Sequence, residues 1–185
     1  MRQIPHALTL LRLFLAPLLV WLIVSSRFRE ALLLVILAGL TDWFDGFAAR
    51  RLGVTGRLGI ILDPLADKAL LVTLFLVLAY VALIPGWVLA LVMGRDLVIV
   101  IGALLLRIFR NIRKFVPSTV GKVSTFFQIV YVLLVLLDAA FPLQLLDWLR
   151  LLALLLTTLF TAWSGYGYVR LGIQLTRLPP VAAAD

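Results

Sequence analysis

Long apolar runs fill most of this chain, and they constrain its fold more than any other feature. The 185 residues are 64% hydrophobic and only 14% charged, and the mean hydropathy is +1.15. A soluble domain of this length could not bury so much apolar surface. We therefore predict an all-α integral membrane protein whose helices cross a lipid bilayer.

Six apolar runs predict six transmembrane helices, preceded by a short helix on the membrane surface. Residues 5–12 mix leucines with polar side chains such as His6 and Arg12, which is typical of a helix that lies on the bilayer. We expect one membrane domain over residues 1–185, with a flexible tail at about 176–185. The predicted spans cover about 13–24, 31 into the segment that starts at 42, 59–83, 87–108, 120–137 and 149–171.

The formal net charge of +8 predicts how these helices are oriented. With six spans, both termini lie on one side of the membrane, together with the loops near 50–57 and 107–122. Basic residues gather on the cytoplasmic side, so we expect this side to be the cytoplasm, and we expect membrane lipids rather than nucleic acid as partners. The short chain shows no transit peptide, which favours a bacterial inner membrane. The twelve basic residues on the predicted cytoplasmic side are Arg2, Arg12, Arg50, Arg51, Arg57, Arg107, Arg110, Arg113, Lys114, Lys122, Arg170 and Arg177, against Arg27, Arg29 and Arg150 on the other.

Four of the nine acidic residues lie in the segment 42–67, among the apolar runs. A charge near the bilayer centre costs at least ~2.5 kcal/mol, so several acids together imply a cation, a proton or a polar substrate. Residues three or four apart share a face of a helix, which applies to Asp42 and Asp45 in the second predicted span. It applies equally to Asp63 and Asp67 in the third. A hairpin of these two helices would form a box of four carboxylates.

Such a box is expected to bind one or two divalent cations. Four unpaired carboxylates would repel one another and take up protons, whereas a hard divalent cation neutralises them with oxygen ligands. The segment contains neither histidine nor cysteine, which favours Mg²⁺ or Mn²⁺ over zinc. A cation held in this way keeps open positions for phosphate oxygens, which points to phosphoryl or phosphatidyl transfer.

Small residues along the same hairpin would let a flat base and a pyrophosphate approach the backbone. Arg50 would balance the phosphate charge there. The alternative for any single glycine is close helix packing, which is the more common role in membranes. Close packing does not explain the aspartates, however, because helices pack without carboxylate side chains. The small residues are Gly46, Ala49, Gly56 and Gly59.

The spacing of these residues resembles the signature of the CDP-alcohol phosphatidyltransferases. Eight positions at fixed spacing match with neither gap nor substitution, which makes the signal specific. The resemblance implies a six-helix, homodimeric membrane enzyme that transfers a phosphatidyl group from CDP-diacylglycerol to an alcohol and releases CMP. The matching sequence reads Asp42-x2-Asp45-Gly46-x2-Ala49-Arg50-x8-Gly59-x3-Asp63-x3-Asp67.

The resemblance also implies a role for each matching residue. Asp42, Asp45 and Asp63 would bind the divalent metal, Mg²⁺ or Mn²⁺. Asp67 would lie close enough to add a ligand, and it would act as general base on the acceptor hydroxyl. The CDP group would contact Arg50 and three of the small residues, namely Gly46, Ala49 and Gly59.

The second half of the chain is expected to hold the acceptor site, with Arg95 and Lys122 as candidate ligands of an anionic group. Arg95 stands next to Asp96 inside a predicted span, and a buried salt bridge that holds helices in register explains this pair equally well. We assign Lys122, Thr125 and Gln128 to one helical face, where an apolar helix would not place a cation and two polar groups.

Within the family, the residues of the second half are more similar to cardiolipin synthases than to phosphatidylglycerophosphate synthases. The latter tend to show a glutamate and a lysine where Asp96 and Ser124 stand here. This favours phosphatidylglycerol as the acceptor, with glycerol-3-phosphate as the alternative. A protein of another class, a cation- or proton-coupled transporter, would also hold acids in the membrane, but would spread them over several helices.

Overall fold

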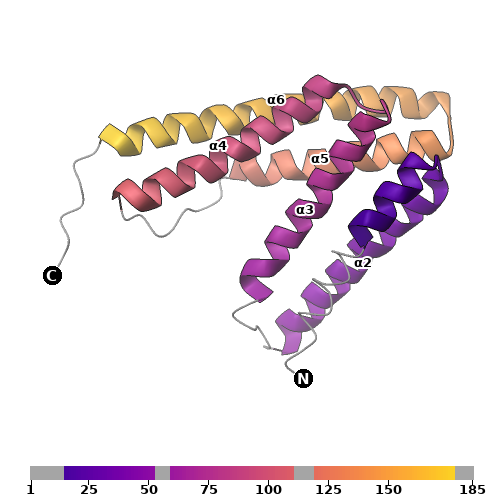
Figure 1. The fold of residues 1–185 in the computed structure, drawn as a ribbon, viewed down its shortest axis with the longest axis horizontal. Coiled ribbons are helices and arrows are strands. Elements are labelled where there is room, and N and C mark those ends of the chain that lie inside the picture. The colour runs from indigo at the N-terminus through magenta and orange to yellow at the C-terminus, as the bar shows by residue number, and fades with distance from the viewer. Residues whose placement is uncertain (1–14, 53–58, 111–118, 178–185) are drawn as a thin grey trace. The chain divides into compact units, whose positions relative to one another are not determined.

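The computed structural model describes the backbone of residues 15–52, 59–110 and 119–177, with side chains except at 42–67, 103, 106–110 and 175–177. All the regular structure in these described ranges is helical, as predicted (Figure 1). The predicted surface helix at 5–12 and most of the predicted flexible tail lie outside the described residues.

Six helical segments of the described residues occupy the positions of the six apolar runs. The last helix differs most from its prediction, since it has 34 residues and extends beyond 149–171 at both ends. Asp147 lies in its first turn, where a carboxylate stabilises the N-terminus of a helix. A helix can also extend beyond its apolar segment, because the polar residues at its ends can be solvated by water. The segments are a helix at 15–24, α2 (Phe28–Leu52), α3 (Gly59–Tyr80), α4 (Gly86–Arg110), α5 (Thr119–Ala140) and α6 (Gln144–Arg177).

Two of the described helices have the length and the apolar composition needed to cross a membrane. They are α5, over its full length, and Gln144–Gln174 within α6. Leu15–Val24 and Lys68–Tyr80 are apolar but shorter. Large hydrophobic side chains are exposed along the helices, for example Trp163, which is 58% exposed. So much exposed apolar surface suits contact with lipid rather than with water.

The chain divides into two compact units. The first contains residues up to Pro85 together with Val132–Trp148, and the second contains Gly86–Tyr131 together with the residues from Leu149 onward. The helices α5 and α6 each contribute to both units. The candidate aspartate motif therefore belongs to the first unit, and the candidate acceptor residues belong to the second.

Two helices of the first unit end in the same backbone motif. Ser26 has a φ of 57°, and its N–H donates to the carbonyl oxygen of Ile23 at 3.0 Å. The N–H of Arg27 donates to the carbonyl oxygen of Leu22 at 2.8 Å, which completes a Schellman motif. Ala82, with a φ of 58°, ends α3 with the same pair of hydrogen bonds. Glycine usually occupies this left-handed position, because a side chain there costs about 1–2 kcal/mol.

Arg29 connects the start of α2 to the end of α5 within the first unit. Its Nε donates to the carbonyl oxygen of Ala140, the last residue of α5, at 3.3 Å. The guanidinium carbon lies 4.9 Å from the centre of the Phe141 ring, where a cation–π interaction adds to the contact. Arg29 therefore satisfies one of the carbonyl groups that a helix leaves without an intrahelical donor at its C-terminus.

Candidate functional site

The four predicted metal ligands lie on the two helix ends that residues 53–58 join (Figure 1). Asp42 and Asp45 are in the C-terminal half of α2. Asp63 and Asp67 are in the N-terminal half of α3. At ~1.5 Å per residue, Asp42 lies about 15 Å from the end of its helix and Asp67 about 12 Å from the start of its own. Along their helices, the two acidic pairs therefore lie at comparable distances from the ends that residues 53–58 join. The side chains of the four aspartates lie outside the described residues.

The residues predicted to contact the CDP group lie on the same two helices. Gly46, Ala49 and Arg50 are in α2, and Gly59 is the first residue of α3. Their side-chain surroundings also lie outside the described residues. Where side chains are described, no three His, Cys, Asp or Glu residues gather in a way that would hold a metal ion. The aspartate motif is therefore the candidate metal centre, as a prediction from the sequence.

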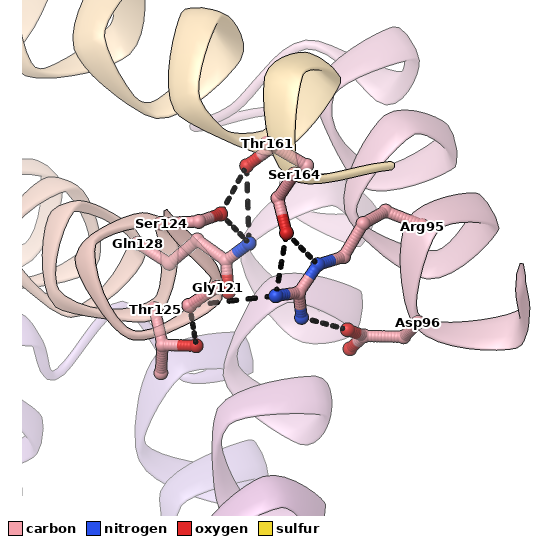
Figure 2. A network of polar contacts seen from close by, with 8 residues as sticks. All are labelled: Arg95, Asp96, Gly121, Ser124, Thr125, Gln128, Thr161 and Ser164. Atoms are coloured by element: carbon pink, nitrogen blue, oxygen red, sulfur yellow. Dashed lines mark hydrogen bonds and ion pairs between the residues drawn. The ribbon is translucent and has the colours of Figure 1, made fainter. Parts of the chain in front are cut away.

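A buried polar network in the second unit is the part of the predicted site whose side chains are described (Figure 2). Arg95 of α4 lies at its centre and is only 7% exposed. Its Nε and Nη2 donate to Ser164 Oγ of α6 at 3.2 and 3.0 Å, and Nη2 also donates to the carbonyl oxygen of Gly121 in α5 at 3.4 Å. Nη1 donates to Asp96 Oδ1 at 2.8 Å in a partly buried ion pair. One guanidinium therefore joins three helices.

The network continues between α5 and α6 through uncharged side chains (Figure 2). Gln128 Nε2 donates to Thr161 Oγ1 at 3.1 Å and to Ser124 Oγ at 3.4 Å, and the two hydroxyl oxygens are 3.1 Å apart. One turn earlier in α6, Thr157 Oγ1 donates to the carbonyl oxygen of Phe127 at 2.9 Å. The four polar side chains are almost completely buried. Because polar groups in lipid need protein partners, these bonds fix how the two helices face each other.

The sequence analysis did not predict three of these buried polar residues, namely Thr157, Thr161 and Ser164. Their spacings of four and three residues put them on one face of α6, and this recurrence in an apolar helix is the signal that predicts them. The predicted shared face of α5 is wrong, since Gln128 is buried whereas Lys122 is exposed. Residues six apart lie about 120° apart around a helix, so they cannot both face the same neighbour.

Arg95 and Lys122, the two candidate acceptor ligands, have opposite surroundings. The charge of Arg95 is balanced by Asp96, and its donors point at protein atoms. Lys122, in the first turn of α5, is exposed. The salt bridge of Arg95 lies within α4, and its hydrogen bonds to Ser164 and Gly121 are the contacts that join α4 to α6 and α5. An acceptor-binding role for either residue remains a prediction.

Comparison with known proteins matches residues 2–163 to the family described as CDP-alcohol phosphatidyltransferase. The "CDP-diacylglycerol--glycerol-3-phosphate 3-phosphatidyltransferase" of Aquifex aeolicus is 38% identical over 131 residues, which cover 68% of this chain and 70% of that protein. The "Cardiolipin synthase (CMP-forming)" of Rattus norvegicus is 33% identical over 192 residues, covering 94% and 64% of the two chains. The "Putative cardiolipin synthase" of Mycobacterium tuberculosis is 30% identical over 167 residues, covering 90% and 77%.

This chain belongs to the CDP-alcohol phosphatidyltransferase family and is a transferase of that class. The resemblance inferred from the aspartate motif is confirmed, together with the branch that holds cardiolipin synthases and the glycerol-3-phosphate enzymes. The chain spans 64% of the rat protein, slightly less than two thirds of that relative's length. Its apolar helices suit a membrane-associated protein.

Proposed function

We propose that this chain transfers the phosphatidyl group of CDP-diacylglycerol to an alcohol and releases CMP. The observation that carries the proposal is the complete eight-position aspartate motif, which lies inside the family-matched residues and on the joined ends of α2 and α3. Membership of a phosphatidyltransferase family supports the reaction class, and the motif supplies the residues that such a transfer needs.

Asp67 acts as the general base in this proposal. It accepts the proton of the acceptor hydroxyl while the hydroxyl oxygen bonds to the phosphorus of the phosphatidyl group. The bond between that phosphorus and the bridging oxygen of the pyrophosphate breaks, and this oxygen leaves as part of CMP. The proton stays on Asp67 until solvent removes it, so atoms and charge balance.

Asp42, Asp45 and Asp63, with Asp67 as a further ligand, would hold Mg²⁺ or Mn²⁺. Four carboxylates without nitrogen or sulfur donors suit a hard cation of this kind. When bound, the cation supplies positive charge against the pyrophosphate as negative charge builds on the leaving group. The residues proposed to bind the CDP group are Gly46, Ala49, Arg50 and Gly59.

Phosphatidylglycerol is the proposed acceptor, and glycerol-3-phosphate is the alternative. The residues of the second half support this order, because Asp96 and Ser124 stand where phosphatidylglycerophosphate synthases tend to show a glutamate and a lysine. The phosphodiester of phosphatidylglycerol carries one negative charge, whereas a phosphomonoester carries about 1.5 to 2 near pH 7 and needs more cationic partners. Relatives named for each reaction are similar to this chain, so both acceptors stay within the family.

We also propose six membrane spans, a homodimer, and a site that faces the cytoplasm of a bacterial inner membrane. The six helical segments of the described residues support the span count, and α4, with 25 residues, is about 37 Å long, which exceeds the hydrocarbon thickness of a bilayer. The uneven distribution of basic residues supports the orientation. The rival class, a cation- or proton-coupled transporter, would account for acids in the membrane but not for the spacing of this motif.

The test is a lipid product assay on the purified full chain, supplied with labelled CDP-diacylglycerol, Mg²⁺ and both acceptors in competition. We expect CMP and cardiolipin in equal amounts. Phosphatidylglycerophosphate as the main product would reverse the order of acceptors. No CMP with either acceptor, together with ion flux in vesicles, would favour the transporter.

Two variants test the proposed role of Asp67 in the same assay. Asp67→Ala should abolish CMP release, because no base remains for the acceptor hydroxyl. Asp147→Asn, an exposed aspartate outside the motif, should release CMP at the unmodified rate. Equal rates in Asp67→Ala and the unmodified chain would remove Asp67 from its proposed role.

A further inference from the structure

The carbonyl oxygen of Gly121 connects Arg95 to the start of α5. Arg95 Nη2 donates to this oxygen from α4 at 3.4 Å, and Thr125 Oγ1 donates to it from the next turn of α5 at 3.1 Å. Lys122 is the following residue, and it is exposed. We infer that Arg95 is a positioning residue, which holds the first turn of α5 so that Lys122, and not Arg95, contacts the anionic group of the acceptor.

The surroundings of the guanidinium leave little room for an acceptor. Two nitrogens donate to Ser164 Oγ, and a third nitrogen pairs with Asp96 at 2.8 Å. The Tyr168 ring, whose centre is 5.8 Å from the guanidinium carbon, covers another side. An incoming phosphate would have to displace the partly buried carboxylate of Asp96, which is costly because the ion pair would be broken.

The same contacts make Arg95 well suited to hold helices in place. A guanidinium presents donors in a rigid planar fork, so it can reach Ser164 on α6 and Gly121 on α5 at once. The ammonium of Lys122, by contrast, is a compact charge on a flexible stem, which meets a phosphate as a point charge. The division of work therefore follows from the chemistry of the two side chains.

A double-mutant cycle on the acceptor KM tests this inference, which rests on the proposed function. Lys122→Ala should raise the acceptor KM about tenfold, the effect of losing one charged hydrogen bond, and leave the CDP-diacylglycerol KM unchanged. Arg95→Gln should also raise the acceptor KM. Because Arg95 acts through Lys122, the double variant should have the same acceptor KM as Lys122→Ala alone. Multiplied effects would show that Arg95 binds the acceptor itself and would overturn the inference.

The variant Arg95→Lys distinguishes the effect of the positive charge at position 95 from the effect of the planar guanidinium. This variant keeps the positive charge but loses the planar fork, so the acceptor KM should stay as high as in Arg95→Gln. Recovery of the normal KM in Arg95→Lys would indicate direct anion binding and would contradict the positioning role.

A second route keeps the inference testable if Arg95→Gln fails to fold. Ser164→Ala removes the α6 anchor of Arg95 without changing any charge, so it should raise the acceptor KM in the unmodified chain but not in Lys122→Ala. Thr158→Ala is the matched control, since the Thr158 hydroxyl donates to the carbonyl oxygen of Leu154 within α6, at 2.8 Å. Failure of the unmodified chain to release CMP would overturn the proposed function. An unchanged acceptor KM in Lys122→Ala, with an active chain, would overturn this inference alone.

Discussion

Thr157 of α6 donates a hydrogen bond to the main-chain carbonyl oxygen of Phe127 in α5, at 2.9 Å. The next residue, Thr158, donates at 2.8 Å to the carbonyl oxygen of Leu154 in its own helix. Two neighbouring threonines therefore make bonds of similar length, and only one of the two bonds joins different helices. This pair allows the contribution of an interhelical bond to be measured against a local one.

Thr157→Val should lower the free energy of unfolding by about 1 kcal/mol, because the variant loses an interhelical hydrogen bond but keeps its shape. Thr158→Val should cost less than half as much, since the lost side-chain bond lies within one turn of α6 and joins no second helix. Unfolding of the detergent-solubilised protein, followed by circular dichroism, measures both values. Equal losses in the two variants would contradict an interhelical role for Thr157.

Asp96→Asn should destabilise the protein by about 3 kcal/mol, because it leaves the buried guanidinium of Arg95 without its ion-pair partner. The double variant Arg95→Met with Asp96→Leu should recover part of this loss, since it leaves no buried charge unpaired. The same unfolding measurement applies. A double variant less stable than Asp96→Asn would show that the pair contributes more than charge compensation.

Ala82→Gly should stabilise the protein by about 0.5–1 kcal/mol. Ala82 ends α3 in the left-handed region, where a Cβ atom is strained and glycine is not, although glycine loses more entropy on folding. Ala79→Gly, three residues earlier inside α3, should destabilise by about 1 kcal/mol. Thermal unfolding compares the two variants, and shifts of the same sign would be inconsistent with the left-handed position of Ala82.

The carboxyl group of Glu30 should titrate below its usual range. The hydrogen bond from Arg27, at 2.8 Å, holds the pKa of Glu30 below its ordinary value. A lowered pKa in the folded state means that this stabilisation is present above the unfolded pKa and is lost as pH falls through the folded pKa. Arg27→Gln should raise the pKa of Glu30, as measured by NMR titration of the side-chain carbon. An unchanged pKa would mean that the ion pair does not persist in solution.

Removal of divalent cations should abolish CMP release, and added Mg²⁺ or Mn²⁺ should restore it. Asp45→Asn should weaken Mn²⁺ binding, as measured by electron paramagnetic resonance, because one of the proposed carboxylate ligands becomes neutral. Asp147→Asn should leave Mn²⁺ binding unchanged. Full activity in a chelator would contradict the proposed metal centre.

The positions of the helices were predictable because each described helix coincides with an apolar run of the sequence. The fourth predicted span, 87–108, differs from α4 (Gly86–Arg110) by only one or two residues at each end. The eight-position motif likewise identified the family, because its information is contained in residue types and spacings. These features depend on residues close together in the chain, so tertiary contacts are not needed to find them.

The contacts of the second unit were less predictable. The sequence suggests two roles for Arg95, a register-holding salt bridge or an anion ligand, and it cannot show that Ser164 and Gly121 lie within reach of the same guanidinium. The sequence does not show which residues lie close to the guanidinium, because those residues belong to other helices.

The helix ends at Ser26 and Ala82, in the first unit, were not predictable either. Both residues adopt a left-handed conformation although neither is a glycine.

The sequence by itself determined that this protein is helical and apolar and that it belongs to a phosphatidyltransferase family, and it supplied the aspartates to which the chemistry is proposed. Composition, helix-length apolar runs and motif spacing are local properties, and they suffice for those conclusions. Only the tertiary structure decided that Arg95 is buried, that Lys122 is exposed, and that hydroxyl groups of α6 bond to α5. The reason is that burial and hydrogen bonding between helices depend on which faces meet, and each face is defined only when its neighbour is in place.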